Sequence, residues 1–217
     1  FNDLQLYATY DLNEKSELAF LGNIAYNTYN FIPQNRETSF GNVYEMLKLK
    51  VYFDGQELDK FASLFGAFMF TYNPFKDLQL KFIASSFATD ERINYDIQGQ
   101  YWLSETGLGY EDEEGLERGI GTYIEHARNH LVANIFNIEH KGYKFYDEGK
   151  LTWGIKYQRE LIYDRVNEWK MVDSAGYTIP STPDIPGIYD TVAAPSLQNV
   201  FKSNNEITSN RINAYLQ

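Results

Sequence analysis

The stretch Leu151–Tyr163, LTWGIKYQRELIY, decides the fold that we expect for this chain. Large apolar or aromatic side chains recur at nearly every second position, and polar or small ones alternate with them. A period of two is typical of a β-strand with two unlike faces. We therefore expect one face to carry Trp153, Ile155, Tyr157 and Leu161, and the other to carry Lys156, Gln158 and Glu160.

Similar alternation predicts further strands on both sides of this stretch. They are Asn2–Tyr10, Leu18–Tyr29, Lys60–Tyr72, a strand that starts at Leu78, His130–His140, and a seventh that begins at Ile207 and runs to Gln217. The fold class that we predict is all-β, with about seven antiparallel strands in up-and-down order.

Short and long connections alternate strictly between the predicted strands. The short ones are Asp11–Glu17, Asn73–Asp77 and Lys141–Lys150, and the long ones are Phe31–Asp59, Asp90–Glu125 and Lys170–Glu206. Loops beyond about 15 residues are uncommon in compact domains, so three of them need a cause. Transmembrane β-barrels supply one, because they have short periplasmic turns and long extracellular loops.

Charge and aromatic residues fit the same interpretation. The predicted outward faces carry almost no charge, whereas Lys81, Lys156 and Glu160 fall on the opposite faces, as a water-filled or plugged lumen permits. Aromatic residues such as Tyr26 and Tyr72 collect near the strand ends, where amphipathic rings favour the headgroup level of a membrane.

Composition excludes several classes of protein. Aromatic residues make up 17% of the 217 residues, which suits alternating strands. No apolar run approaches the roughly 18 residues of a membrane helix. The net charge of −11 argues against nucleic acid as a partner, because phosphate binding needs a basic face. There are no cysteines, and therefore no disulfide or cysteine-based metal site.

Five stretches, in order along nearly all of the chain, resemble the barrel domain of TonB-dependent receptors, in particular those with a carboxypeptidase-like regulatory domain at the N-terminus. They are QNRETSFG (Gln34–Gly41), KVYFDGQE (Lys50–Glu57), YDIQGQYWL (Tyr95–Leu103), GTYIEHARN (Gly121–Asn129) and DSAGY (Asp173–Tyr177). The resemblance does not indicate a substrate.

This resemblance implies a place in the outer membrane of a Gram-negative bacterium, in a barrel of about 22 strands closed by an N-terminal plug. It also implies import of a small nutrient (a glycan, a peptide or a metal chelate) with energy supplied through TonB. Residues 1–217 contain no recognisable plug or TonB-contacting segment, so we expect them to be part of the barrel. The expected partners are membrane lipid, the remaining strands and plug, the TonB complex and the nutrient.

No catalytic constellation is visible, and we expect neither an enzyme nor a cofactor. His126 and His130 are four residues apart, but on a strand this spacing separates them by about 13 Å, so a structural role is favoured over a metal site. The acidic run Glu111–Glu114 lacks the ligand spacing of a calcium loop. The best candidates for ligand contact are aromatic residues in or beside the long loops: Tyr101, Trp102, Trp169 and Tyr177.

The alternative for each candidate is a purely structural role, because aromatic residues in loops also pack against one another. The main alternative for the whole chain is a soluble or surface-exposed β-rich module that binds a glycan or a peptide without transport. A glycoside hydrolase with paired loop carboxylates, such as Asp90 and Asp96, is weaker, because nothing places them in a cleft. Dependence on detergent separates the first two.

Overall fold

The computed structural model describes residues 1–42, 46–106, 117–173 and 196–217, and every regular element in these ranges is a β-strand. The strands are β1 (Asn2–Asn13), β2 (Ser16–Phe31), β3 (Arg36–Gly41), β4 (Met46–Phe75), β5 (Leu78–Thr106), β6 (Glu117–Tyr146), β7 (Gly149–Asp173) and β8 (Ser196–Leu216). Within these ranges, no helix is long and apolar enough to cross a membrane.

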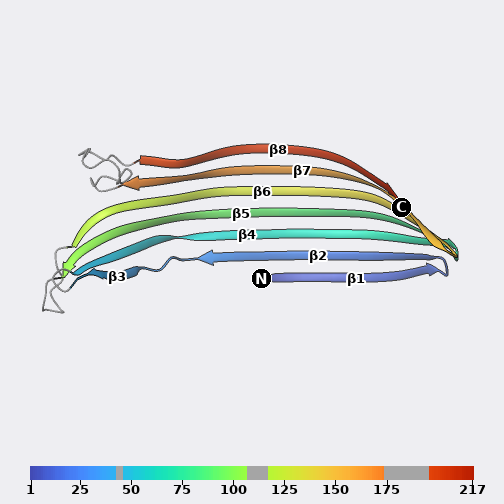
Figure 1. Cartoon of the computed structure of the whole chain (residues 1–217), viewed down its shortest axis with the longest axis horizontal. Helices are drawn as coiled ribbons and strands as arrows, with labels where there is room; N and C mark the ends of the chain where they lie inside the picture. The colour runs from blue at the N-terminus through green and yellow to red at the C-terminus, as the bar shows by residue number, and fades with distance from the viewer. Residues whose placement is uncertain (43–45, 107–116, 174–195) are drawn as a thin grey trace.

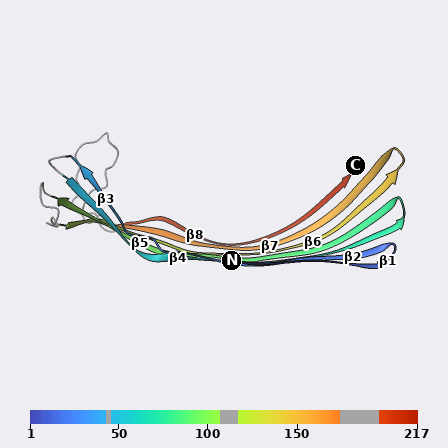
Figure 2. The ribbon, with the colours of Figure 1, turned by 90° about the horizontal axis from the view of Figure 1, so that it is seen from below.

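The strands form one antiparallel meander (Figure 1). Their order is β1-β2-β4-β5-β6-β7-β8, and the short β3 pairs with the part of β4 that lies beyond the end of β2. The all-β, up-and-down prediction is confirmed, with eight strands where about seven were expected. Across the described ranges the sheet is not closed into a barrel: β1 and β8 are its edges, and Figure 2 shows one curved and twisted layer.

Three tight turns join strands at one end of the sheet. Residues 14–15, 76–77 and 147–148 are all that separate β1 from β2, β4 from β5, and β6 from β7. Each turn lies within a predicted short connection, which strand pairing shortens: Phe75 pairs with Leu78, and Tyr146 with Gly149. The predicted turn positions are therefore correct.

Where the structure describes them, the predicted long loops are largely strand, and this part of the prediction was wrong. The strands β4 to β7 are 25 to 30 residues long, and they remain paired far beyond the predicted ends. Lys50 pairs with Trp102, and Gln100 with Thr122, inside what was expected to be loop. Pairing satisfies the backbone groups of these segments, and the period of two does continue into them: Leu47, Leu49, Val51 and Phe53 alternate with Lys48, Lys50, Tyr52 and Asp54. The prediction gave more weight to the polar content of these segments than to this alternation.

The register gathers apolar side chains in rows on one face of the sheet, which we call the apolar face. The other face, which we call the polar face, is mixed: it carries Lys81, Lys156 and Glu160, and also Phe65, Phe87 and Ile135. Two neighbouring rows on the apolar face illustrate it: Leu18, Phe70, Phe82, His140 and Ile155, then Phe20, Phe68, Ala84, Ile138 and Tyr157. Trp153 and Leu161 share this face, while Lys156, Gln158 and Glu160 alternate onto the polar face, as predicted.

Neither face is covered by a second layer. Among the described residues, the buried hydrophobic side chains are only Ala19, Ala127 and Ala133. In contrast, Phe68 is 63% exposed and Ile138 is 53% exposed, although both lie in the middle of the apolar rows. Soluble monomers rarely expose a contiguous apolar surface of this kind.

The apolar rows end along a diagonal line. On each strand we take the first charged or amide side chain that follows the apolar positions, counted outward from the turns. From β4 to β7 this side chain lies two residues nearer to the turns on each successive strand, and on β8 it is level with that of β7. These side chains are Lys60, Asp90, Asn134, Arg159 and Asn210. Between β4 and β8 this boundary shifts by about 20 Å along the strand direction over about 19 Å measured across the sheet. The strands are therefore inclined by about 45° to the apolar band.

This inclined boundary explains why Arg159, a charged residue, lies on the apolar face, which the sequence pattern did not lead us to expect. If the strands stood upright in the band, Arg159 would lie in its interior, between Phe136 and Asn210. With inclined strands, it lies at the edge of the band instead. The band is therefore continuous from β1 to β8.

Candidate functional site

Of the candidate contact residues, Tyr101, Trp102 and Trp169 lie beyond the apolar band, in what we call the outer extension: residues 46–58 of β4, 93–106 of β5, 117–129 of β6 and 166–173 of β7. Successive side chains of a strand point to opposite faces. The two faces of the outer extension consequently carry two separate clusters.

The cluster on the polar face consists of Tyr101, Tyr123, Glu125 and Lys170. The ring centroids of Tyr101 and Tyr123 are 5.9 Å apart. The Lys170 ammonium lies 4.7 Å from the centroid of the Tyr123 ring and 2.8 Å from the Glu125 carboxylate. The Tyr123 ring covers Gly99, its partner across the strands, where a Cβ would come within 2.4 Å of the ring. Glycine at this position therefore lets the tyrosine lie flat on the sheet.

Electrostatics keep this cluster in a defined protonation state. The hydrogen bond to Glu125 raises the pKa of Lys170, which holds the ammonium protonated. Partial burial, followed by the nearby Tyr101 and Glu125, raises the pKa of Tyr123, so its phenol stays neutral. Two aromatic faces, neutral hydroxyls and a cation are groups that stack on sugar rings or pack on peptides and hydrogen-bond to them.

The neighbourhood on the polar face is acidic. Partial burial raises the pKa of Tyr95, and the carboxylates of Glu168, Glu125 and Glu57 add to the effect. Burial, followed by the charge of Asp59, raises the pKa of Glu57. An approaching ligand on this face therefore meets carboxylates around the tyrosines.

In the cluster on the apolar face of the outer extension, the polar side chains are paired with one another. The Asp96 carboxylate accepts a hydrogen bond from Arg128 and lies 2.6 Å from Nδ1 of His126. The His126 ring stacks on Trp169 with centroids 4.8 Å apart. Partial burial acts to raise the pKa of Asp96, but the bonds from Arg128 and His126 outweigh it, and the net pKa is lowered. These groups are already paired, which leaves little bonding capacity for a ligand.

The four residues predicted from the sequence do not form one site. Tyr101 lies on the polar face, whereas Trp102 and Trp169 lie on the apolar side, Trp102 over Gly119 and Trp169 against His126. Tyr177 lies outside the described residues.

Tyr123, Glu125 and Lys170 were missed because the sequence alone does not define the register between the segments that carry them. The alternation of Tyr95, Ile97, Gly99 and Tyr101 was the available signal that this segment is a strand. Only the pairing of β5 with β6, and of β6 with β7, then places the lysine and the two tyrosines together.

All three histidines have protein partners. His126 contacts Asp96, and His130 lies 3.2 Å from an Asp90 oxygen. His140 Nδ1 lies 3.2 Å from the Lys81 carbonyl oxygen, and its Nε2 accepts a hydrogen bond from the Trp153 indole at 3.2 Å. No group of three His, Cys, Asp or Glu residues in the described ranges could hold a metal ion.

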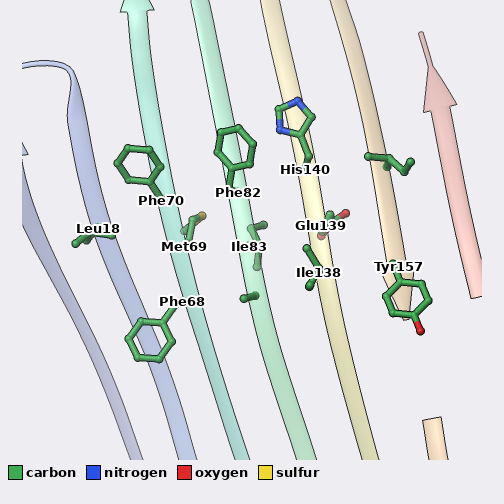
Figure 3. Close-up of a pocket in the computed structure, with 12 residues that line it drawn as sticks. Leu18, Phe68, Met69, Phe70, Phe82, Ile83, Ile138, Glu139, His140 and Tyr157 are labelled. Atoms are coloured by element: carbon green, nitrogen blue, oxygen red, sulfur yellow. The ribbon is translucent and has the colours of Figure 1, made fainter. Parts of the chain in front are cut away.

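A shallow hollow of about 410 Å³ lies within the apolar band. Figure 3 shows Phe70, Phe82 and His140 side by side on β4, β5 and β6 along this hollow. The Phe82 and His140 rings stack with centroids 4.6 Å apart. Because its walls are mostly aromatic and aliphatic, the hollow suits an acyl chain better than a polar nutrient.

A search of protein-family models gave no match for this chain, and no curated protein matches it significantly. The resemblance to TonB-dependent receptors therefore stays a prediction, and the function rests on the physical features of the sheet.

Proposed function

We propose that this chain forms part of the wall of a β-barrel in the outer membrane of a Gram-negative bacterium, in a receptor of the TonB-dependent type that imports a small nutrient. The observation that carries the proposal is the contiguous apolar band on one face of the sheet; the other face is mixed, with Lys81, Lys156 and Glu160 among residues such as Phe65 and Ile135. Lipid would cover the band, and the polar face would line the lumen.

The dimensions of the band support this proposal. On β5 the apolar positions run from Leu78 to Ala88, which is about 34 Å along the strand at about 3.4 Å per residue. Strands inclined by about 40 to 45° turn this length into a height of about 25 Å, close to the apolar band of outer-membrane barrels. The inclination comes from the diagonal boundary and is independent of the band's length.

The open edges also support a larger assembly. β1 and β8 each pair on one side only, so each presents a row of unpaired backbone groups. In lipid each such group costs several kcal/mol, roughly, which makes an open edge untenable there. Further strands of the same receptor would pair with both edges, and a plug would cover part of the polar face.

Within this proposal the polar-face cluster of the outer extension contacts the nutrient. Tyr101 and Tyr123 offer aromatic faces, and Lys170 offers a cation held by Glu125. These groups bind and orient a ligand and need no bond chemistry. The nutrient would be a glycan, a peptide or a metal chelate, and transport would come from movement of the plug, driven through the TonB complex.

The test is the behaviour of the full-length protein on extraction. We expect it in the outer-membrane fraction, to be soluble only with detergent, and to migrate faster on gels when unheated, as closed barrels do. A stable monomer in detergent-free buffer would overturn the proposal and favour a surface-exposed β-rich module that binds a glycan or a peptide.

A further inference from the structure

Three strands carry an acidic residue followed directly by a basic one at or beyond the outer limit of the apolar band: Asp59-Lys60 on β4, Glu91-Arg92 on β5 and Asp164-Arg165 on β7. The register aligns them, because Lys60 pairs with Arg92, Arg92 with His130, and His130 with Arg165. Alternation therefore places the three carboxylates on the polar face and the basic groups on the apolar face. We call Lys60, Arg92, His130 and Arg165 the basic row.

The basic row meets the outer limit of the apolar band at Lys60 and lies progressively farther beyond it toward β7, where that limit is at Arg159. The adjacent row toward the turns contains Ala62, Asp90, Val132, Tyr163 and Glu206. Because the strands are inclined, Lys60 lies at the edge of the band and Arg165 farther out. Long basic side chains in such a place lay their methylene stems on apolar surface and keep the charge at the polar layer.

Carboxylates on the apolar face neutralise only part of the row. Asp90 lies 2.9 Å from Arg92 and 3.2 Å from His130. Glu206 is the other carboxylate in the adjacent row. Lys60 and Arg165 are exposed and form no ion pair with any residue in the described ranges.

Arg165 also lines a hollow of about 370 Å³ between β7 and β8. The other polar side chains around it on the same face are Asn167, Lys202 and Asn204, and no carboxylate lines it. Amide and cationic donors around a carboxylate-free hollow suit an anion with several oxygens, such as a phosphate.

We propose that the basic row binds the phosphate groups of anionic lipid headgroups in the leaflet next to the outer limit of the apolar band. This inference rests on the proposed function, because it requires the apolar face to contact lipid. A lipid whose acyl chains cover Phe68 and Ile138 holds its headgroup at the height where the row begins. Charge complementarity and continuity with the band both favour a lipid over an acidic protein.

The test compares two double variants of the full-length protein in mild detergent. Lys60→Gln with Arg165→Gln removes the two unpaired charges of the row. Lys81→Gln with Lys156→Gln removes the same charge from the polar face, where neither lysine forms an ion pair with described residues. Native mass spectrometry measures the affinity of each protein for phosphatidylglycerol and for phosphatidylcholine. Each basic residue near an anionic surface contributes about fivefold, so the first variant should lose roughly 30-fold for phosphatidylglycerol.

The control variant should keep the wild-type preference for phosphatidylglycerol, and an excess of inorganic phosphate should not displace the lipid. Unchanged lipid affinity in the first variant, or equal losses in both, would overturn the inference. Displacement by inorganic phosphate would identify a free-anion site and also overturn it. If the protein is heat-modifiable and requires detergent in any of these cases, the lipid inference fails while the proposed function stands. Solubility without detergent would overturn both the lipid inference and the proposed function.

Discussion

Replacing Ile155 by arginine places a charge in the middle of the apolar band. Ile155 lies beside His140 in the row of Phe82 and is 52% exposed, with the diagonal boundary farther out on the same strand. If the apolar face meets lipid, this position lies near the bilayer midplane, where an arginine costs about 2–4 kcal/mol. In water the same exposed substitution would cost about 0.5 kcal/mol or less.

The matched control is Gln158→Arg, three residues along β7 on the polar face. Gln158 is half-buried beside the ion pair of Arg211 with Glu160, whose atoms are 2.9 Å apart. The new charge would meet Arg211 and Glu160 together, so the net change should stay below about 1 kcal/mol. Reversible urea unfolding of the full-length protein in lipid vesicles, followed by gel mobility and circular dichroism, measures both. Equal losses at the two positions would refute the assignment of faces.

Three further predictions concern the outer extension. Gly55→Ala should destabilise the pairing of β4 with β5 by about 1–3 kcal/mol, because Gly55 has a φ of 103° and a Cβ there would lie 1.9 Å from the Asp96 carbonyl oxygen. Hydrogen exchange measures this loss of stability. The control is Gly149→Ala, where an added Cβ would have nothing within 4 Å. Tyr101→Ala should lower nutrient uptake several-fold while Trp102→Ala leaves it unchanged, since the two lie on opposite faces; equal effects would contradict the polar-face site. Because the folded pKa of Asp96 lies below its unfolded value, its contribution to stability should be present at neutral pH and fade as pH falls below about 4. Urea unfolding across this range should show the loss, and Asp96→Asn should remove this part of the pH dependence.

Local alternation was sufficient to predict the strands of the apolar band and the positions of their turns. The stretch around Ile155 shows why: one of its faces is apolar, so the period of two is visible in the residues themselves. The positions of the turns were also predictable, although Asn73 and Pro74, which were expected to open one of them, lie in β4 at a register irregularity, and the turn itself is formed by Lys76 and Asp77. The assignment of side chains to two faces followed directly from the alternation.

The outer extension and its cluster could not be predicted in the same way. From Tyr95 to Tyr101 the period of two persists, because Tyr95, Ile97, Gly99 and Tyr101 alternate with polar side chains, but this alternation alone does not say which strand lies beside the segment. The contacts of Tyr123 with Tyr101 and with Lys170 depend on the register of three strands. Register is a non-local property, set by pairing along the whole hairpin. The charge sorting of the basic row is hidden in the sequence for the same reason.

A single-layer sheet of this kind lacks the usual source of folding energy, and this constrains what surrounds it. Full burial of a large apolar side chain contributes about 1.5–3 kcal/mol. Phe68, Leu64 and Ile212 are 63%, 54% and 72% exposed, so most of that contribution is unrealised within the described residues. Backbone pairing between strands cannot replace it, because a hydrogen bond adds only about 1 kcal/mol net in water. Some apolar medium must therefore cover this face in the working protein. The inclined outer limit of the band is the geometry expected if that medium is a flat layer crossed by tilted strands; another protein surface would have no reason to follow one plane across β4 to β8.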